Sequence, residues 1–138
     1  AVFLPMPEIF VKYEMSFVGR SPIAFQNIKH IQPLQSNELA NLLRGDDIYI
    51  TCSANDPASN GVGEALACGL PVAFLHSGGH PEIIKDAGEG FKNETECLSA
   101  ITKISGATKY YSSKIDIPTI DQIGSQYIEF FKRLTNGT

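Results

Sequence analysis

Two carboxylates flank a glycine-bearing stretch in the middle of the chain. Asp56 lies among loop-forming residues, and Glu64 follows it after seven intervening residues. Gly61 and Gly63 lie between them and leave backbone N–H groups uncovered by side chains. Carboxylates accept hydrogen bonds from sugar hydroxyls, and uncovered N–H groups donate to phosphate oxygens. These residue types in this order suit a phosphorylated ligand that also carries hydroxyl groups.

The neighbouring sequence places this stretch at the start of a helix that follows a strand. Residues 48–52 and 72–75 are β-branched, aromatic and aliphatic runs, which indicates buried strands. Between them, Ser59 or Asn60 is a suitable helix N-cap, and Gly69 is a suitable helix stop. The sequence therefore predicts a strand, a loop, a helix and a second strand.

A helix start carries free N–H groups and the positive end of the helix dipole. We therefore expect the backbone of Asn60, Gly61 and Val62 to bind a phosphate group, with Glu64 facing the same crevice one turn later. The alternative is an ordinary turn at Asp56, glycines that only permit close packing, and a solvated Glu64. Spacing alone does not separate these interpretations, because Gly-x-Gly at a helix start is a weak signal.

The stretch from Asn55 to Val72, followed by Ser77-Gly78-Gly79-His80-Pro81-Glu82, resembles the C-terminal domain of a retaining GT-B glycosyltransferase of group 1. That family carries a Glu-x7-Glu signature whose second acid opens Glu-Ala-x-Ala-x-Gly-x-Pro-Val. The resemblance implies that Glu64 binds the ribose of a nucleotide-sugar donor. It also implies that Asp56, which stands where the family has glutamate, contacts the transferred sugar near its anomeric carbon.

The loop after the second strand is a further candidate for donor binding. Gly78 and Gly79 can expose successive N–H groups as an anion-binding nest. The resemblance implies that this loop lines the donor pocket, which adds His80 and Glu82 to the candidates. The alternative is a plain turn with a surface histidine. We expect no metal site and no cofactor, because Gly78-Gly79 breaks any helix that would bring His76 and His80 together.

Strands alternating with helices predict an α/β fold, with a parallel sheet covered by helices on both faces. We expect a single Rossmann-like domain over residues 16–138, equivalent to the C-terminal half of a GT-B fold, after an irregular segment over residues 1–15. In such sheets ligands bind beyond the carboxyl ends of the strands, where both candidate loops lie.

Composition excludes several classes of protein. The 138 residues suffice for one domain with a core, and a net charge of −4 argues against a nucleic-acid surface. The sequence has no apolar run long enough for a transmembrane helix. Its three cysteines are widely spaced, which is typical of reduced thiols in a cytoplasmic protein.

The C-terminal region predicts an amphipathic helix over residues 119–134, ending in an apolar Phe130-Phe131 pair. In the family this helix often packs on the N-terminal, acceptor-binding domain, for which the chain has no room. We expect that domain, a partner chain or a second copy of the helix to cover it. The family's basic phosphate loop also has no clear counterpart, because Arg20 and Lys29 are the only nearby basic residues.

These absences leave alternatives open. One is a non-catalytic relic or interaction domain with weak or no nucleotide binding, because stabilising the departing phosphate is a large part of catalysis. Another is a nucleotide-sugar epimerase, although there the paired glycines would precede the Glu64 helix. We expect the isolated chain to have little or no transferase activity.

Overall fold

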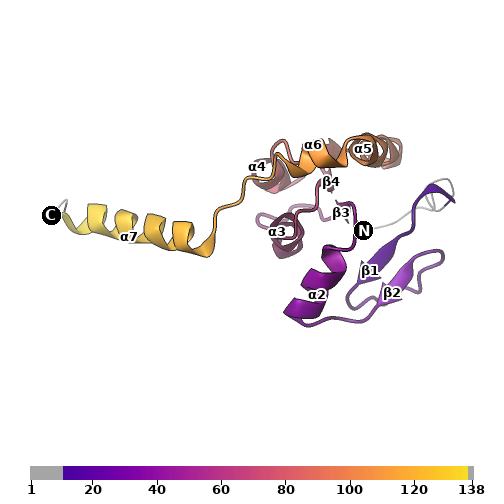
Figure 1. Ribbon diagram of the computed structural model, residues 1–138, viewed down its shortest axis with the longest axis horizontal. Helices are drawn as coiled ribbons and strands as arrows, with labels where there is room; N and C mark the ends of the chain where they lie inside the picture. The colour runs from indigo at the N-terminus through magenta and orange to yellow at the C-terminus, as the bar shows by residue number, and fades with distance from the viewer. Residues whose placement is uncertain (1–10, 137–138) are drawn as a thin grey trace.

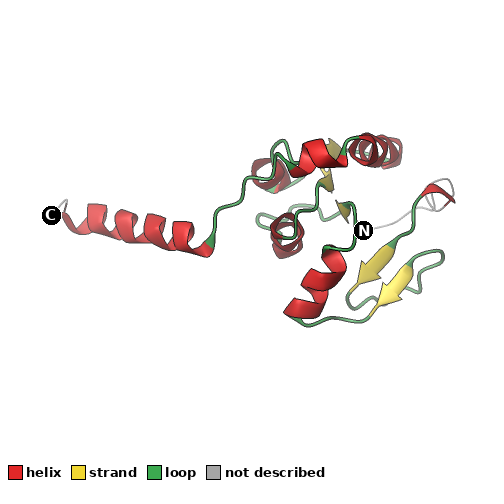
Figure 2. Ribbon diagram, viewed as in Figure 1, coloured by secondary structure: helices red, strands yellow, loops and turns green. Residues whose placement is uncertain are grey.

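The computed structural model describes residues 11–136, which form an α/β domain and a separate C-terminal helix (Figures 1 and 2). The strands are β1 (Ser16–Val18), β2 (Lys29–Ile31), β3 (Tyr49–Thr51), β4 (Val72–Leu75) and β5 (Gly88–Phe91). The helices are α2 (Ser36–Leu43), α3 (Asn60–Ala67), α4 (His80–Ile84), α5 (Glu94–Gly106), α6 (Thr108–Ser112) and α7 (Ile120–Asn136). Of the segment predicted to be irregular, residues 1–10 lie outside the described residues, and Val11 and Lys12 have helical backbone.

The predicted α/β class with parallel strands is confirmed, but the strands form two small sheets. β3, β4 and β5 lie in that order in a three-stranded parallel sheet, with Tyr49 opposite Val72 and Val72 opposite Gly88. β1 and β2 form a separate parallel pair. The ring of Phe17 on β1 lies 4.7 Å from that of Phe25, measured between centroids, so aromatic packing supports this smaller sheet.

Helices cover both faces of the three-stranded sheet. Successive side chains of a strand point to opposite faces, and β4 shows this with three buried residues. Val72 and Phe74 pack with α3 and α4, whereas Ala73 packs with α5 on the other face. A third cluster joins α2 to α3 through Leu43 and Ala65. The sheet and its covering helices therefore fix where β3 and β4 end.

Both ends of α3 are set by local sequence. Ser59 is the N-cap, and its hydroxyl oxygen accepts from the Val62 N–H at 3.5 Å. At the other end Gly69 has a φ of 90°, which favours glycine, and its N–H donates to the Leu66 carbonyl. The Leu70 N–H donates to the Ala65 carbonyl at 3.0 Å, which completes a Schellman motif. α3 therefore begins and ends where its capping residues predict.

α2 begins with a capping box. Ser36 is the first helical residue, and Gln35 is the N-cap. The Glu38 carboxylate accepts from the Gln35 N–H at 3.1 Å, so these two residues form a capping box.

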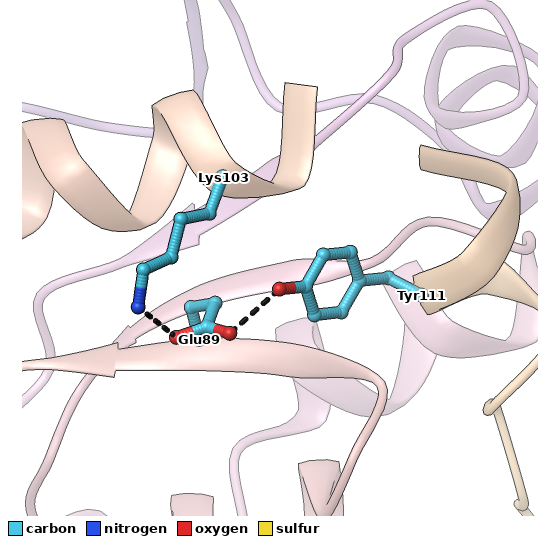
Figure 3. A network of polar contacts seen from close by, with 3 residues as sticks. All are labelled: Glu89, Lys103 and Tyr111. Atoms are coloured by element: carbon cyan, nitrogen blue, oxygen red, sulfur yellow. Dashed lines mark hydrogen bonds and ion pairs between the residues drawn. The ribbon is translucent and has the colours of Figure 1, made fainter. Parts of the chain in front are cut away.

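A polar cluster ties α5 and α6 to the sheet (Figure 3). The Tyr111 hydroxyl on α6 donates to the Glu89 carboxylate on β5 at 2.6 Å, and Lys103 of α5 lies 3.3 Å from the other carboxylate oxygen. The hydrogen bond to Glu89, together with burial, raises the pKa of Tyr111 to about 12. This cluster holds the end of the α/β domain before the chain leaves toward α7.

α7 stands apart from the α/β domain, at the end of an extended segment (Figure 1). It covers Ile120–Asn136, where the sequence predicts a helix over residues 119–134. Several of its large apolar side chains are exposed, and they are Ile120, Tyr127, Ile128, Phe130, Phe131 and Leu134. No helix within residues 11–136 is long and apolar enough to cross a membrane.

Candidate functional site

The two candidate loops meet at the carboxyl ends of β3 and β4, which are neighbours in the sheet. The loop after β3 contains Asn55 and Asp56, and the loop after β4 contains Ser77 and Gly79. The Asn55 N–H donates to the Ser77 hydroxyl oxygen at 2.9 Å, and the Gly79 N–H donates to the Asp56 carbonyl at 2.9 Å. The structure therefore brings the two predicted loops together and joins them by hydrogen bonds.

The two loops can approach this closely because residues 78 and 79 are both glycines. A Cβ atom on Gly78 would collide with the backbone of Asp56, and one on Gly79 would collide with the Pro57 carbonyl. Gly78 also has a φ of 59°, a conformation that favours glycine. Close loop packing thus accounts for both glycines. The Gly79 N–H already donates to the Asp56 carbonyl, so one donor of the predicted anion-binding nest is not free for a ligand.

Asp56 is half-buried, and its side chain folds back onto its own loop. Its Oδ1 accepts from the Ala58 N–H at 3.1 Å, as in an Asx turn. The turn that was the alternative interpretation of Asp56 is therefore present. A turn of this kind also fixes the carboxylate at the sheet edge, so the geometry is compatible with either role.

The start of α3 supplies free donors. Among residues 11–136 the N–H groups of Asn60 and Gly61 have no acceptor, whereas the Val62 N–H is taken by the Ser59 hydroxyl. Asn60 is exposed and Gly61 is half-buried, so a ligand can reach both. Two of the three predicted backbone donors are therefore available to an anion.

Glu64 is exposed on α3, about one turn after these donors. Within the described chain its carboxylate has no hydrogen-bond or ion-pair partner. Burial, and after it the negative charge of Glu64, raises the pKa of the Tyr49 hydroxyl. The carboxylate is thus free to accept hydrogen bonds from a ligand.

Tyr49 is a site residue that sequence reasoning missed. Its half-buried side chain packs against the buried clusters that contain Leu66 and Ala65 of α3, and its hydroxyl reaches the first turn of that helix. A Cβ atom added at Gly61 would lie only 2.5 Å from the Tyr49 hydroxyl oxygen. The one signal in the sequence is a polar-tipped side chain, Tyr49, in an otherwise aliphatic strand beside a glycine-bearing helix.

His80 is buried, so the alternative of a surface histidine is wrong. Its Nδ1 lies 3.1 Å from the Leu75 carbonyl, which can only accept, so Nδ1 carries the hydrogen. Nε2 is buried and has no partner in the described part of the chain. The ring also contacts Phe74, at 6.4 Å between centroids. His80 therefore anchors α4 beneath the second loop and keeps one unsatisfied ring nitrogen.

Two hollows in the described surface lie away from this site. One hollow is lined by residues between Val11 and Lys29 at β1 and β2. Another lies between Lys85 and the start of α7. Nor do three metal-ligating side chains come together anywhere in residues 11–136. The candidate site is an open edge with helix N–H donors, a free carboxylate and a tyrosine hydroxyl, which suits a ligand that carries both phosphate and hydroxyl groups.

Comparison with known families identifies the chain. The family model described as glycosyl transferases group 1 matches residues 24–103, which is more than half of the chain and includes both loops and α3. No curated protein and no solved structure matches the chain. The chain belongs to the group 1 glycosyl transferases.

Proposed function

We propose that this chain is the donor-binding domain of a retaining glycosyltransferase, which transfers a hexose from a nucleoside diphosphate sugar to an acceptor. The observation that carries the proposal is the start of α3, where the free N–H groups of Asn60 and Gly61 precede the unpaired carboxylate of Glu64. The N–H groups and the helix dipole would bind the diphosphate. Glu64 would accept hydrogen bonds from the ribose hydroxyls.

The remaining candidates take roles at the same edge. Asp56, held by its turn, would contact hydroxyls of the transferred sugar near the anomeric carbon. Gly78 and Gly79 would hold the second loop against the first, and His80 would support that loop from below. Val62 would contribute its backbone only weakly, because Ser59 already takes its N–H.

In the proposed reaction the bond between the anomeric carbon and the diphosphate oxygen breaks, and the acceptor oxygen forms the new bond on the same face of the sugar. The acceptor hydroxyl loses its proton, and the nucleoside diphosphate leaves with the bonding electron pair. The α3 donors would stabilise the negative charge that develops on the departing phosphate. We propose no metal in this step, and that an N-terminal acceptor domain or a partner chain completes the cleft.

The cellular location belongs to the same proposal. All three cysteines are free thiols, which supports a reducing, cytoplasmic environment. The interaction-domain alternative is supported by the engagement of the Gly79 N–H and the Asp56 carboxylate in loop contacts.

Calorimetric titration with nucleoside diphosphates and their hexose conjugates tests the proposal. We expect saturable binding that Glu64→Ala weakens by about 1.5–3 kcal/mol, the range for a lost hydrogen bond to a charged group. Glu129→Ala, which removes an exposed carboxylate from α7, is the matched control and should leave the affinity unchanged. Absence of binding up to millimolar ligand, or equal affinity in Glu64→Ala, would contradict the proposal and favour an interaction domain.

A further inference from the structure

The apolar side chains of α7 follow the spacing of a coiled-coil seam. Intervals of three and four residues alternate along one stripe, which we call the α7 seam, and its members are Ile120, Ile123, Tyr127, Phe130 and Leu134. This alternation is the a and d pattern of a heptad repeat. Four of the five are exposed, with Phe130 at 56% and Tyr127 at 61%. The seam is therefore shaped to pack against another helix.

The chain's own domain does not cover the seam. α7 makes no extensive contact with another described helix or strand, and it stands apart from the domain in Figure 1. Its polar side chains Gln122 and Gln126 instead line a hollow with Lys85 and Asp116. Those two residues form an ion pair at 3.0 Å at the edge of the domain. The polar face of α7 thus lies toward the domain, and the seam is left without a partner.

A helix of this composition needs packing to stay folded. It has 17 residues, contains Gly124 in its interior and several β-branched side chains, all of which lower helix propensity. The ion pair between Glu129 and Arg133, at 3.7 Å and highly exposed, adds little. Because helices of this length are close to marginal in water, burial of the apolar face must supply most of the stability.

We propose that a second copy of this chain covers the α7 seam, with the two α7 helices packed antiparallel. A heptad seam is complementary to itself, because each a or d side chain inserts between four side chains of the facing helix. With the seam residues at the a and d positions, Gly124 and Phe131 each follow a d residue and therefore both occupy e positions. In an antiparallel pair the e positions of the two helices lie together in opposite order, so Phe131 of one copy lies over Gly124 of the other. Gly124 offers this space, since nothing lies within 4 Å of a Cβ atom placed there.

Charge and area support the same arrangement. Asp121 lies in the first turn of α7, and Lys132 and Arg133 lie near its end. Antiparallel pairing brings the acidic start of each helix toward the basic end of the other, whereas parallel pairing brings the two basic ends together. The four exposed seam side chains and Phe131 contribute about 100 Å² each, and so about 1,000 Å² over both copies. That area is at the lower limit for a specific interface, which predicts a dissociation constant in the micromolar range.

Sedimentation of the full chain from micromolar to millimolar concentration tests the dimer. We expect the mass to rise from one chain to two, and Phe130→Glu to raise the dissociation constant by at least about tenfold. Ile128→Glu is the matched control, because Ile128 is also 56% exposed but lies off the seam, and it should not change the constant. A chain that stays monomeric overturns the proposal and leaves an acceptor domain to cover the seam. A dimer insensitive to Phe130→Glu overturns it as well.

A change of side-chain size tests the orientation. Gly124→Leu raises helix propensity but fills the space assigned to Phe131, so it should weaken the dimer while raising the helix content of the monomer. Adding Phe131→Ala should restore the dimer. A dimer strengthened by Gly124→Leu alone would overturn the antiparallel arrangement. The whole experiment is independent of the donor site, so nucleotide binding can fail without affecting its outcome.

Discussion

The Tyr49 hydroxyl lies against Gly61, where it occupies the space that a side chain at residue 61 would need. A Cβ atom at this position would lie 2.5 Å from the hydroxyl oxygen but 3.5 Å from the ring carbon that carries it. Only the first distance is a clash. The glycine in the first turn of α3 is therefore matched to a hydroxyl group from β3, and both lie next to Glu64 and the free helix donors.

This contact predicts a dependence between the two positions. Gly61→Ala should destabilise the chain by about 1–3 kcal/mol through overpacking, because the Tyr49 ring is held by its neighbours on α2 and α3. In a Tyr49→Phe background the clash disappears, and Gly61→Ala should become neutral or stabilising, since alanine favours helix by about 1 kcal/mol over glycine. Urea unfolding of the four variants measures the coupling.

Gly63→Ala provides the control for this cycle. Nothing lies within 4 Å of a Cβ atom at Gly63, which is also helical. We expect it to stabilise the chain by about 0.5–1 kcal/mol in both backgrounds. Equal effects of Gly61→Ala with and without the Tyr49 hydroxyl would contradict the proposed contact.

A second prediction concerns the loop junction at Gly78. Gly78 and Gly69 both have positive φ, but a Cβ atom would meet the Asp56 backbone at Gly78 and open space at Gly69. Gly69→Ala should therefore cost only backbone strain of about 1 kcal/mol, and Gly78→Ala should cost clearly more. The free energy of unfolding of each variant gives the difference. Similar costs at the two positions would mean that the loops separate without penalty.

The central strand, helix and strand could be predicted because their ends are encoded locally. Ser59 caps α3, and Gly69 ends it in a Schellman motif, both within the reach of a few residues. β5 could not be predicted in the same way, because two of its four residues are glycines, which disfavour strands. Gly88 is needed there because a Cβ atom would collide with the Val72 carbonyl, a contact that depends on the sheet.

The residues of the candidate site also fall into two groups, those encoded in one local stretch and those placed by tertiary packing. Asp56, Glu64 and the donors of α3 belong to one continuous stretch, so their types and spacing were visible in the sequence. Tyr49 enters the site only because the packing of β3 beside α3 brings its hydroxyl against Gly61. Burial of His80 likewise depends on how α4 packs beneath the loop. Tertiary packing determines the position of Tyr49 and the burial of His80, and no local sequence pattern predicts either.

A third prediction concerns the reactivity of Cys97. Burial, with a smaller effect from the nearby Cys52, raises the pKa of the Cys97 thiol to about 11. Because the thiolate is the reactive form, a rise of two pKa units alone should slow alkylation about a hundredfold. Peptide mapping after brief exposure to iodoacetamide should show Cys97 unlabelled in the native chain and labelled in urea. Equal labelling under both conditions would contradict the burial of this thiol on α5.

The last prediction is the response of the Tyr111–Glu89 hydrogen bond to alkaline pH. The pKa of Tyr111 rises from 10.0 in an unperturbed side chain to about 12 in the folded chain. The folded state thus holds the phenolic proton more tightly than the unfolded state does. This bond should contribute its full stabilisation below pH 10 and lose it as the pH rises toward 12. Tyr49, Cys52 and Cys97 have raised pKa values too, so total stability should fall in the alkaline range for several reasons.

Comparison with Tyr111→Phe isolates the contribution of this bond. The variant should be less stable at neutral pH by about 1.5–3 kcal/mol, the range for a hydrogen bond to a charged group. The gap between the two proteins should close as the pH rises from 10 toward 12, because ionised Tyr111 can no longer donate to Glu89. Tyr110→Phe changes an exposed neighbour and should follow the native profile. Urea unfolding across this pH range measures the gap, and a gap that stayed constant would contradict its origin in this hydrogen bond.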